Sequence, residues 1–92
     1  MLKNLFRVDN KVIVITGATG LLGRRHAEAI ACYGGTPILL DLSQQKINDF
    51  AIELNDKYGT DSIGFSIDIT NEKAIESNAK LLMKKFGKID IL

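Results

Sequence analysis

The stretch KVIVITGATGLLG occupies residues 11–23 and joins a β-branched run to a glycine-rich loop. The run at residues 12–15 is continuously apolar, which favours a strand buried on both faces, as in a parallel sheet. The loop carries Gly17, Gly20 and Gly23, and an amphipathic segment follows it. A strand, a glycine loop and a helix in this order are typical of the pyrophosphate-binding turn of a dinucleotide fold.

The helix expected after this loop offers a binding site for an anion. Backbone N–H groups at a helix start are free, and the positive end of the helix dipole lies there. Gly17 allows a tight turn at the strand end, and Gly20 and Gly23 let a cofactor or a packed strand approach the backbone closely. We therefore expect a pyrophosphate to bind at Gly17, Thr19, Gly20, Leu21, Leu22 and Gly23. An ordinary strand-to-helix connection that is rich in glycine is the alternative.

Composition and charge argue against several classes of protein. Of 92 residues, 46% are hydrophobic and 25% are charged, which is ordinary for one globular domain. The formal net charge of +1 argues against charge-driven binding of nucleic acid or of a membrane surface. No apolar run approaches the roughly 18–20 residues of a membrane span, and residues 1–11 lack the apolar core of a signal peptide. Cys32 is the only cysteine, so no disulfide forms within the chain, and we expect a cytoplasmic protein.

Strand and helix patterns alternate along the chain. We expect strands at residues 12–16, 36–41, 62–69 and 89–92, and helices at about residues 22–33, 44–58 and 71–86. This alternation predicts a doubly wound parallel sheet with right-handed crossovers and helices on both faces. The predicted fold class is α/β, a three-layer αβα fold of the Rossmann type with the order βαβαβαβ and strand order 3-2-1-4. We expect residues 1–92 to be the N-terminal part of this dinucleotide-binding domain, interrupted in the fourth strand.

Local signals predict the ends and the buried faces of the helices. Ser43 and Thr70 are the expected N-caps of the second and third helices, because a hydroxyl there accepts a hydrogen bond from the helix backbone. Leu21 and Leu22 are expected to extend the apolar face of the first helix. The buried face of the third helix is expected to contain Ala74, Ile75, Ala79, Leu82, Met83 and Phe86.

Asp41 closes the second expected strand, 24 residues after Gly17. In dinucleotide folds, an acidic residue about 20 positions after the loop accepts hydrogen bonds from the ribose hydroxyls. The same carboxylate would repel the additional 2′-phosphate of NADP. Leu42 rather than an arginine follows Asp41, and no lysine or arginine precedes Leu21 in the loop. We therefore expect NAD rather than NADP, with Asp41 and Leu42 at the ribose; a polar strand end near a helix start is the alternative.

Asp68 ends the third expected strand beside the same crevice. Its carboxylate would accept a hydrogen bond from the exocyclic amine of adenine, while the backbone of Ile69 contacts the ring. Charge pairing with the start of the third helix is the alternative. Arg24 is expected to point to solvent, His26 has no nearby acid or nucleophile in sequence, and Cys32 is expected to pack. No spacing typical of metal ligands is present, so we expect neither a metal site nor a catalytic residue.

Four features in order resemble the N-terminal part of a short-chain dehydrogenase/reductase. They are LFRVDNKVIVITGA at residues 5–18, the glycine loop, the pair Asp41-Leu42, and SIDIT at residues 66–70 followed by FGKIDIL at residues 86–92. The usual loop of the family reads TGxxxGxG, whereas Leu21 stands in place of the middle glycine. Gly20 instead produces TGxxGxxG, the spacing of the extended branch that acts on nucleotide sugars.

The resemblance implies a homo-oligomeric oxidoreductase that transfers hydride between NAD and a carbonyl or alcohol of a small-molecule substrate. The catalytic serine and the Tyr-x-x-x-Lys motif of the family come after the fourth strand. Tyr33 and Tyr58 are followed four residues later by Pro37 and Ser62, so neither matches the catalytic tyrosine. Two alternatives stay open: an NAD-dependent nucleotide-sugar epimerase or dehydratase, and a non-catalytic nucleotide-binding module.

Overall fold

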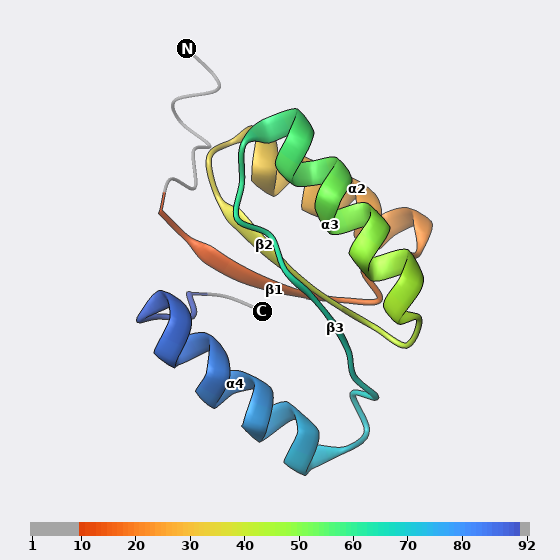
Figure 1. Cartoon of the computed structure of the whole chain (residues 1–92), viewed down its shortest axis with the longest axis vertical. Coiled ribbons are helices and arrows are strands. Elements are labelled where there is room, and N and C mark those ends of the chain that lie inside the picture. Colours follow the sequence, from red (N-terminus) through yellow and green to blue (C-terminus); the bar gives the residue numbers. More distant parts are fainter. Residues whose placement is uncertain (1–9, 91–92) are drawn as a thin grey trace.

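The computed structural model describes residues 10–90, which form a three-stranded parallel sheet with helices on both faces (Figure 1). In chain order the elements are β1 (Val12–Thr16), α2 (Leu21–Cys32), β2 (Thr36–Asp41), α3 (Gln44–Tyr58), β3 (Gly64–Ser66) and α4 (Glu72–Phe86). The sheet order is β1-β2-β3, and both neighbouring pairs are parallel. This arrangement confirms the α/β fold class and the 3-2-1 part of the predicted strand order.

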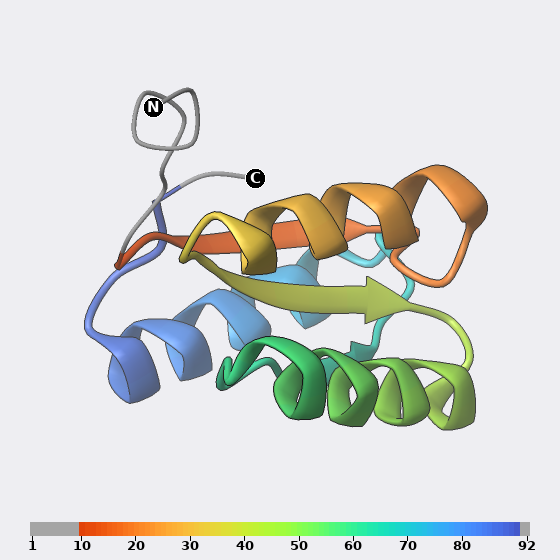
Figure 2. The same cartoon turned by 90° about the horizontal axis from the view of Figure 1, so that it is seen from above.

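Successive side chains of β1 point into two separate apolar cores. On one face, Ile13 and Ile15 pack with the buried sides of α2 and α3. On the other face, Val12 and Val14 pack with Leu82 of α4. Figures 1 and 2 show α2 and α3 together on one side of the sheet and α4 on the other. The predicted burial of β1 on both faces and the three-layer arrangement are therefore confirmed.

The third strand is shorter than predicted, with only Gly64–Ser66 in place of residues 62–69. At the amino-terminal end, the Asn55 side chain binds both backbone polar groups of Ser62, and at the carboxyl-terminal end Asp68 forms a turn with Thr70. The Asn55 Nδ2 donates to the Ser62 carbonyl oxygen at 3.0 Å, and the Asn55 Oδ1 accepts from the Ser62 N–H at 2.8 Å. These hydrogen bonds hold Ser62 against α3 instead of in the sheet.

One of the two predicted helix caps is correct and the other is wrong by one residue. Ser43 caps α3, and its hydroxyl oxygen accepts a backbone N–H of the first turn at 3.4 Å. The N-cap of α4 is Asn71, whose Oδ1 accepts from the Ala74 N–H at 3.1 Å. Thr70 does not cap the helix, because its hydroxyl donates to the Asp68 carboxylate at 2.7 Å.

Three apolar side chains that are predicted to be buried are exposed. Leu21 and Leu22 are 76% and 66% exposed, because the first turn of α2 projects beyond the end of β1 (Figure 2). Met83 is 49% exposed, since it lies about 100° around the helix from Leu82, which faces the sheet. The buried side of α4 includes a polar residue, Asn78, four positions before Leu82. In residues 10–90 no helix has the length and apolar character needed to cross a membrane.

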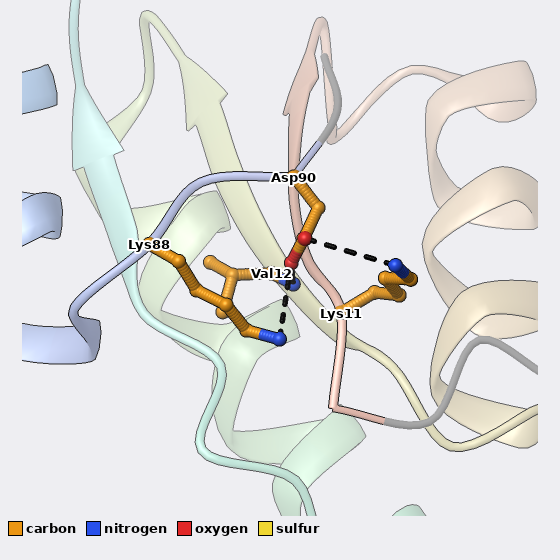
Figure 3. Close-up of polar contacts among 4 residues, drawn as sticks. All are labelled: Lys11, Val12, Lys88 and Asp90. Atoms are coloured by element: carbon orange, nitrogen blue, oxygen red, sulfur yellow. Dashed lines mark hydrogen bonds and ion pairs between the residues drawn. The ribbon is translucent and has the colours of Figure 1, made fainter.

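The predicted fourth strand is not formed at Ile89 and Asp90, and residues 91 and 92 lie outside the described part of the chain. Asp90 nevertheless lies beside Val12 at the edge of β1 (Figure 3), and it binds both backbone polar groups of Val12. The Asp90 N–H donates to the Val12 carbonyl oxygen at 2.8 Å, and the Asp90 Oδ2 accepts from the Val12 N–H at 2.7 Å. Two ammonium groups lie 3.9 and 3.5 Å from this carboxylate, those of Lys11 and Lys88.

Candidate dinucleotide-binding site

The glycine loop connects the carboxyl end of β1 to the first turn of α2. Gly17 has a φ of +61°, a left-handed conformation that glycine adopts readily, and its carbonyl oxygen accepts from the Gly20 N–H at 3.0 Å. A Cβ at Gly23 would overlap that carbonyl oxygen and lie 2.9 Å from the Gly17 carbonyl carbon. The helix therefore packs on the loop at a distance that only glycine permits at position 23.

The start of α2 can receive an anion. Its N-cap is Gly20, which has an extended conformation and forms no side-chain cap. The N–H groups of the first helical turn have no partner within the helix, and the helix dipole is positive at this end. The first turn contains Leu21, Leu22 and Gly23, and both leucine side chains extend into solvent. This geometry suits a phosphate bound by backbone groups rather than by side chains.

Asp41 at the end of β2 is fastened to the glycine loop. Its Oδ2 accepts from the Thr19 N–H at 2.9 Å and from the Thr19 hydroxyl at 2.6 Å, while its Oδ1 accepts from the Leu42 N–H at 2.7 Å. A neighbouring backbone bond, from the Ala18 N–H to the Leu40 carbonyl oxygen at 3.2 Å, joins the same two segments. Thr19 is predicted to contact pyrophosphate, whereas here its side chain contacts the predicted ribose residue.

These contacts keep Asp41 ionised. The Thr19 hydroxyl makes the largest contribution in lowering the pKa of the Asp41 carboxyl, and partial burial opposes it by raising that pKa. The backbone N–H groups of Thr19 and Leu42 lower the pKa further, as does the positive charge of Lys46. At neutral pH the group is a carboxylate, which accepts hydrogen bonds and donates none.

A pocket of about 200 Å³ brings the two predicted acidic residues together at the carboxyl end of the sheet. Asp41 and Leu42 line it from the end of β2, and Asp68 and Ile69 line it from the segment after β3. Leu42 and Ile69 are 70% and 57% exposed, so the pocket has apolar walls that are open to solvent. Gly17 also lines the pocket and connects it to the glycine loop.

At this pocket the Asp68 side chain closes a local turn with Thr70. Its Oδ1 accepts from the Thr70 N–H at 2.9 Å and from the Thr70 hydroxyl at 2.7 Å. The Thr70 hydroxyl and then the Thr70 backbone N–H lower the pKa of Asp68. Among the described residues no hydrogen bond involves Asp68 Oδ2, so this oxygen can accept one from a ligand.

The other chemistry-bearing residues do not join the site. The Arg24 guanidinium binds the Glu53 carboxylate at 2.8 Å and lies 4.1 Å from the centre of the Phe50 ring, so it contacts α3 rather than solvent alone. His26 is exposed, and Cys32 is half-buried. Across residues 10–90 no cluster of three or more histidine, cysteine or acidic side chains is arranged to hold a metal.

Two features of the site have no counterpart in the sequence predictions. One is the link between Thr19 and Asp41, which depends on how two loops meet. The other is Lys46, whose charge reaches Asp41 from the first turn of α3. Its position three residues after the cap Ser43 places it in the helical turn beside the strand end, and that spacing was the available signal.

The fold and the site together define a Rossmann-type α/β domain with a glycine loop beside an acidic pocket. Comparison with known proteins identifies the family: the model described as short chain dehydrogenase matches residues 11–92. The chain belongs to this family, which confirms the resemblance drawn from its motifs.

Individual relatives agree with the family match. The chain is 35% identical over 86 residues to a 7alpha-hydroxysteroid dehydrogenase from Bacteroides fragilis, covering 94% of this chain and 33% of that protein. A short chain dehydrogenase/reductase from Burkholderia phymatum, solved in complex with NAD, is 32% identical with a TM-score of 0.83, covering 91% of this chain and 30% of that one. L-Sorbose reductase from Gluconobacter frateurii, complexed with NADPH and L-sorbose, shares the fold with a TM-score of 0.86 at 23% identity, covering 92% and 33% of the two chains. The chain spans about a third of the length of the curated relatives it matches.

Proposed function

We propose that this chain is the cofactor-binding part of an NAD(H)-dependent oxidoreductase of the short-chain dehydrogenase type. The complete enzyme would transfer hydride between nicotinamide and a carbonyl or alcohol group of a small-molecule substrate. The observation that carries the proposal is the uncapped glycine-rich start of α2 lying beside the ionised Asp41. The cofactor supplies the hydride chemistry, and the residues of this chain bind and orient it.

Three groups of residues would hold the dinucleotide. The pyrophosphate would bind at the backbone of Gly17, Gly20 and the first turn of α2. The adenosine ribose would bind Asp41 and Leu42, and adenine would lie in the pocket that also contains Asp68 and Ile69. The free Oδ2 of Asp68 is then an acceptor for the exocyclic amine of adenine.

We propose NAD rather than NADP because the carboxylate of Asp41 repels a phosphate on the ribose. The Burkholderia phymatum relative, at 32% identity, was solved with NAD, which supports a nicotinamide dinucleotide as the cofactor class. The family match and the dehydrogenase names of the relatives do not favour an epimerase or a non-catalytic module. A cytoplasmic homo-oligomer with no nucleic-acid or membrane partner completes the proposal, supported by the single cysteine, the net charge of +1 and the family resemblance.

Direct titration of the chain with NADH, followed by the fluorescence of the reduced nicotinamide or by calorimetry, tests this function. We expect NADH to bind at least about tenfold more tightly than NADPH, a difference of about 1.4 kcal/mol. Replacing Asp41 by alanine should weaken NADH binding and narrow the gap to NADPH. A folded chain that binds neither nucleotide at millimolar concentration contradicts the proposal, and unchanged affinities in Asp41→Ala remove Asp41 from the site.

A further inference from the structure

Both oxygens of the Asp41 carboxylate accept hydrogen bonds from the protein itself. Thr19 donates two hydrogen bonds to Oδ2, at 2.9 Å from its N–H and 2.6 Å from its hydroxyl, and the Leu42 N–H donates to Oδ1 at 2.7 Å. These donors belong to two segments, the glycine loop and the end of β2. A rotation of the Asp41 side chain away from the pocket would break all three hydrogen bonds at once.

Only one of these three donors depends on the identity of a side chain. The two backbone N–H groups would be present with almost any residue at positions 19 and 42. The Thr19 hydroxyl makes the shortest of the three bonds, and a hydrogen bond to an ionised acceptor is stronger than one between neutral groups. The side chain at position 19 therefore determines how firmly this carboxylate is held.

We infer that Thr19 is a specificity-determining residue that fixes the Asp41 carboxylate in place as a repulsive element against a ribose 2′-phosphate, an inference that rests on the proposed function. Discrimination between two ligands is a difference of affinities, and a rejected ligand must meet a penalty that it cannot relieve. A mobile carboxylate could swing away from the phosphate of NADP. A fixed carboxylate keeps its negative charge at the pocket and still accepts hydrogen bonds from the hydroxyls of NAD.

The charges around the pocket agree with this role. Asp68 lines the same pocket and also has a lowered pKa, but the proposed function places it at adenine, so Asp41 is the carboxylate that faces the ribose. Lys46 is the cation whose charge acts on Asp41. Its exposed side chain is a flexible counter-charge, whereas Asp41 is held by three hydrogen bonds. Removal of the Thr19 hydroxyl would therefore loosen the Asp41 carboxylate and reduce the repulsion that a phosphate meets at this pocket.

The test compares Thr19→Val, which has nearly the same shape without the hydroxyl, with Thr19→Ser, which keeps it. We expect Thr19→Val to lower the ratio of NADH to NADPH affinity about tenfold, and Thr19→Ser to restore most of it. Thr70→Val is the matched control, because Thr70 donates its N–H and hydroxyl to Asp68 in the same way. It should change the two affinities equally and leave their ratio unaltered.

Carbon-13 NMR titration of the aspartate carboxyls provides a readout that needs no nucleotide. Thr19→Val should raise the pKa of Asp41 towards its ordinary value and leave Asp68 unchanged, and Thr70→Val should do the reverse. A loss of both nucleotide affinities in equal proportion in Thr19→Val would show a purely structural role and overturn the inference. An unchanged preference for NADH in that variant overturns it as well, while the proposed function stands. Failure of the unmodified protein to bind either nucleotide overturns the proposed function and the inference together.

Discussion

Replacing Gly23 by alanine should destabilise the protein although alanine is the better helix former. The added Cβ would overlap the Gly17 carbonyl oxygen and lie 2.9 and 3.0 Å from the Gly17 carbonyl carbon and the Ala18 Cα. These neighbours are backbone atoms, so they cannot turn aside as a flexible side chain would. Overpacking of this kind costs about 1–3 kcal/mol, and we expect the upper part of this range, about 2–3 kcal/mol, because backbone atoms are overlapped. The higher helix propensity of alanine offsets about 1 kcal/mol of this cost.

The expected net loss in the free energy of unfolding is about 1–2 kcal/mol, which for a domain of this size lowers Tm by roughly 4–16 °C. Thermal unfolding followed by circular dichroism measures it. Gly20→Ala is a graded control, because its Cβ would lie 3.3 Å from the same oxygen, and φ there is −73°, which alanine adopts. We expect a smaller loss from Gly20→Ala. A Gly23→Ala protein as stable as the unmodified one would refute the close packing of α2 on the loop.

Further predictions concern the contacts that hold the remaining segments. Asn55→Ala removes both hydrogen-bond partners of the Ser62 backbone, and Ser62 is only 5% exposed. We therefore expect the free energy of unfolding in urea to fall by about 1–3 kcal/mol, with little change for the control Ile52→Ala, whose side chain is exposed. If Asn55→Ala is as stable as the unmodified protein, this contact does not stabilise the fold. The Asp90 carboxylate accepts a hydrogen bond from the Val12 N–H, which is the largest cause of its lowered pKa. The stability that this carboxylate contributes is therefore complete above its ordinary pKa of 3.8 and is lost as the pH falls through its lower pKa in the folded protein. We therefore expect Asp90→Asn to be less stable than the unmodified protein at pH 7 and to lose less stability on acidification; parallel Tm curves against pH would contradict this.

Much of the fold could be predicted because its signals are local. The run at residues 12–15 indicated a strand buried on both faces, and Ser43 indicated the start of α3. The N-cap of α4 was misplaced because Thr70 and Asn71 are both suitable caps, and only the contact of Thr70 with Asp68 decides between them. Such a contact depends on the path of the chain after β3, which no local pattern specifies.

In the site, too, local patterns predicted some features, and others depended on contacts between distant residues. Strand ends at the same edge of a parallel sheet predicted that Asp41 and Asp68 meet, and one pocket contains both. The burial of Leu21 and Leu22 was predicted wrongly, because the apolar pattern does not reveal where α2 passes the end of the sheet. The bond between Thr19 and Asp41 joins residues 22 positions apart and depends on the side-chain conformation of both, so it became visible only in three dimensions.

The contact between Asp90 and Val12 also has a consequence during protein synthesis. The edge of β1 that faces β2 can begin to pair as soon as Thr36 has been made, because Thr36 is the partner of Val12 in β2. The opposite edge of β1 has to wait for Asp90, which follows Val12 by 78 positions. At ~5–20 residues per second this wait is about 4–16 s, and throughout it β1 presents an unpaired edge to other nascent chains. Among the described strands β1 is translated first, and Val12 at its outer edge gains its hydrogen-bond partner only when Asp90 has been made, so the speed of translation sets how long that edge stays unpaired.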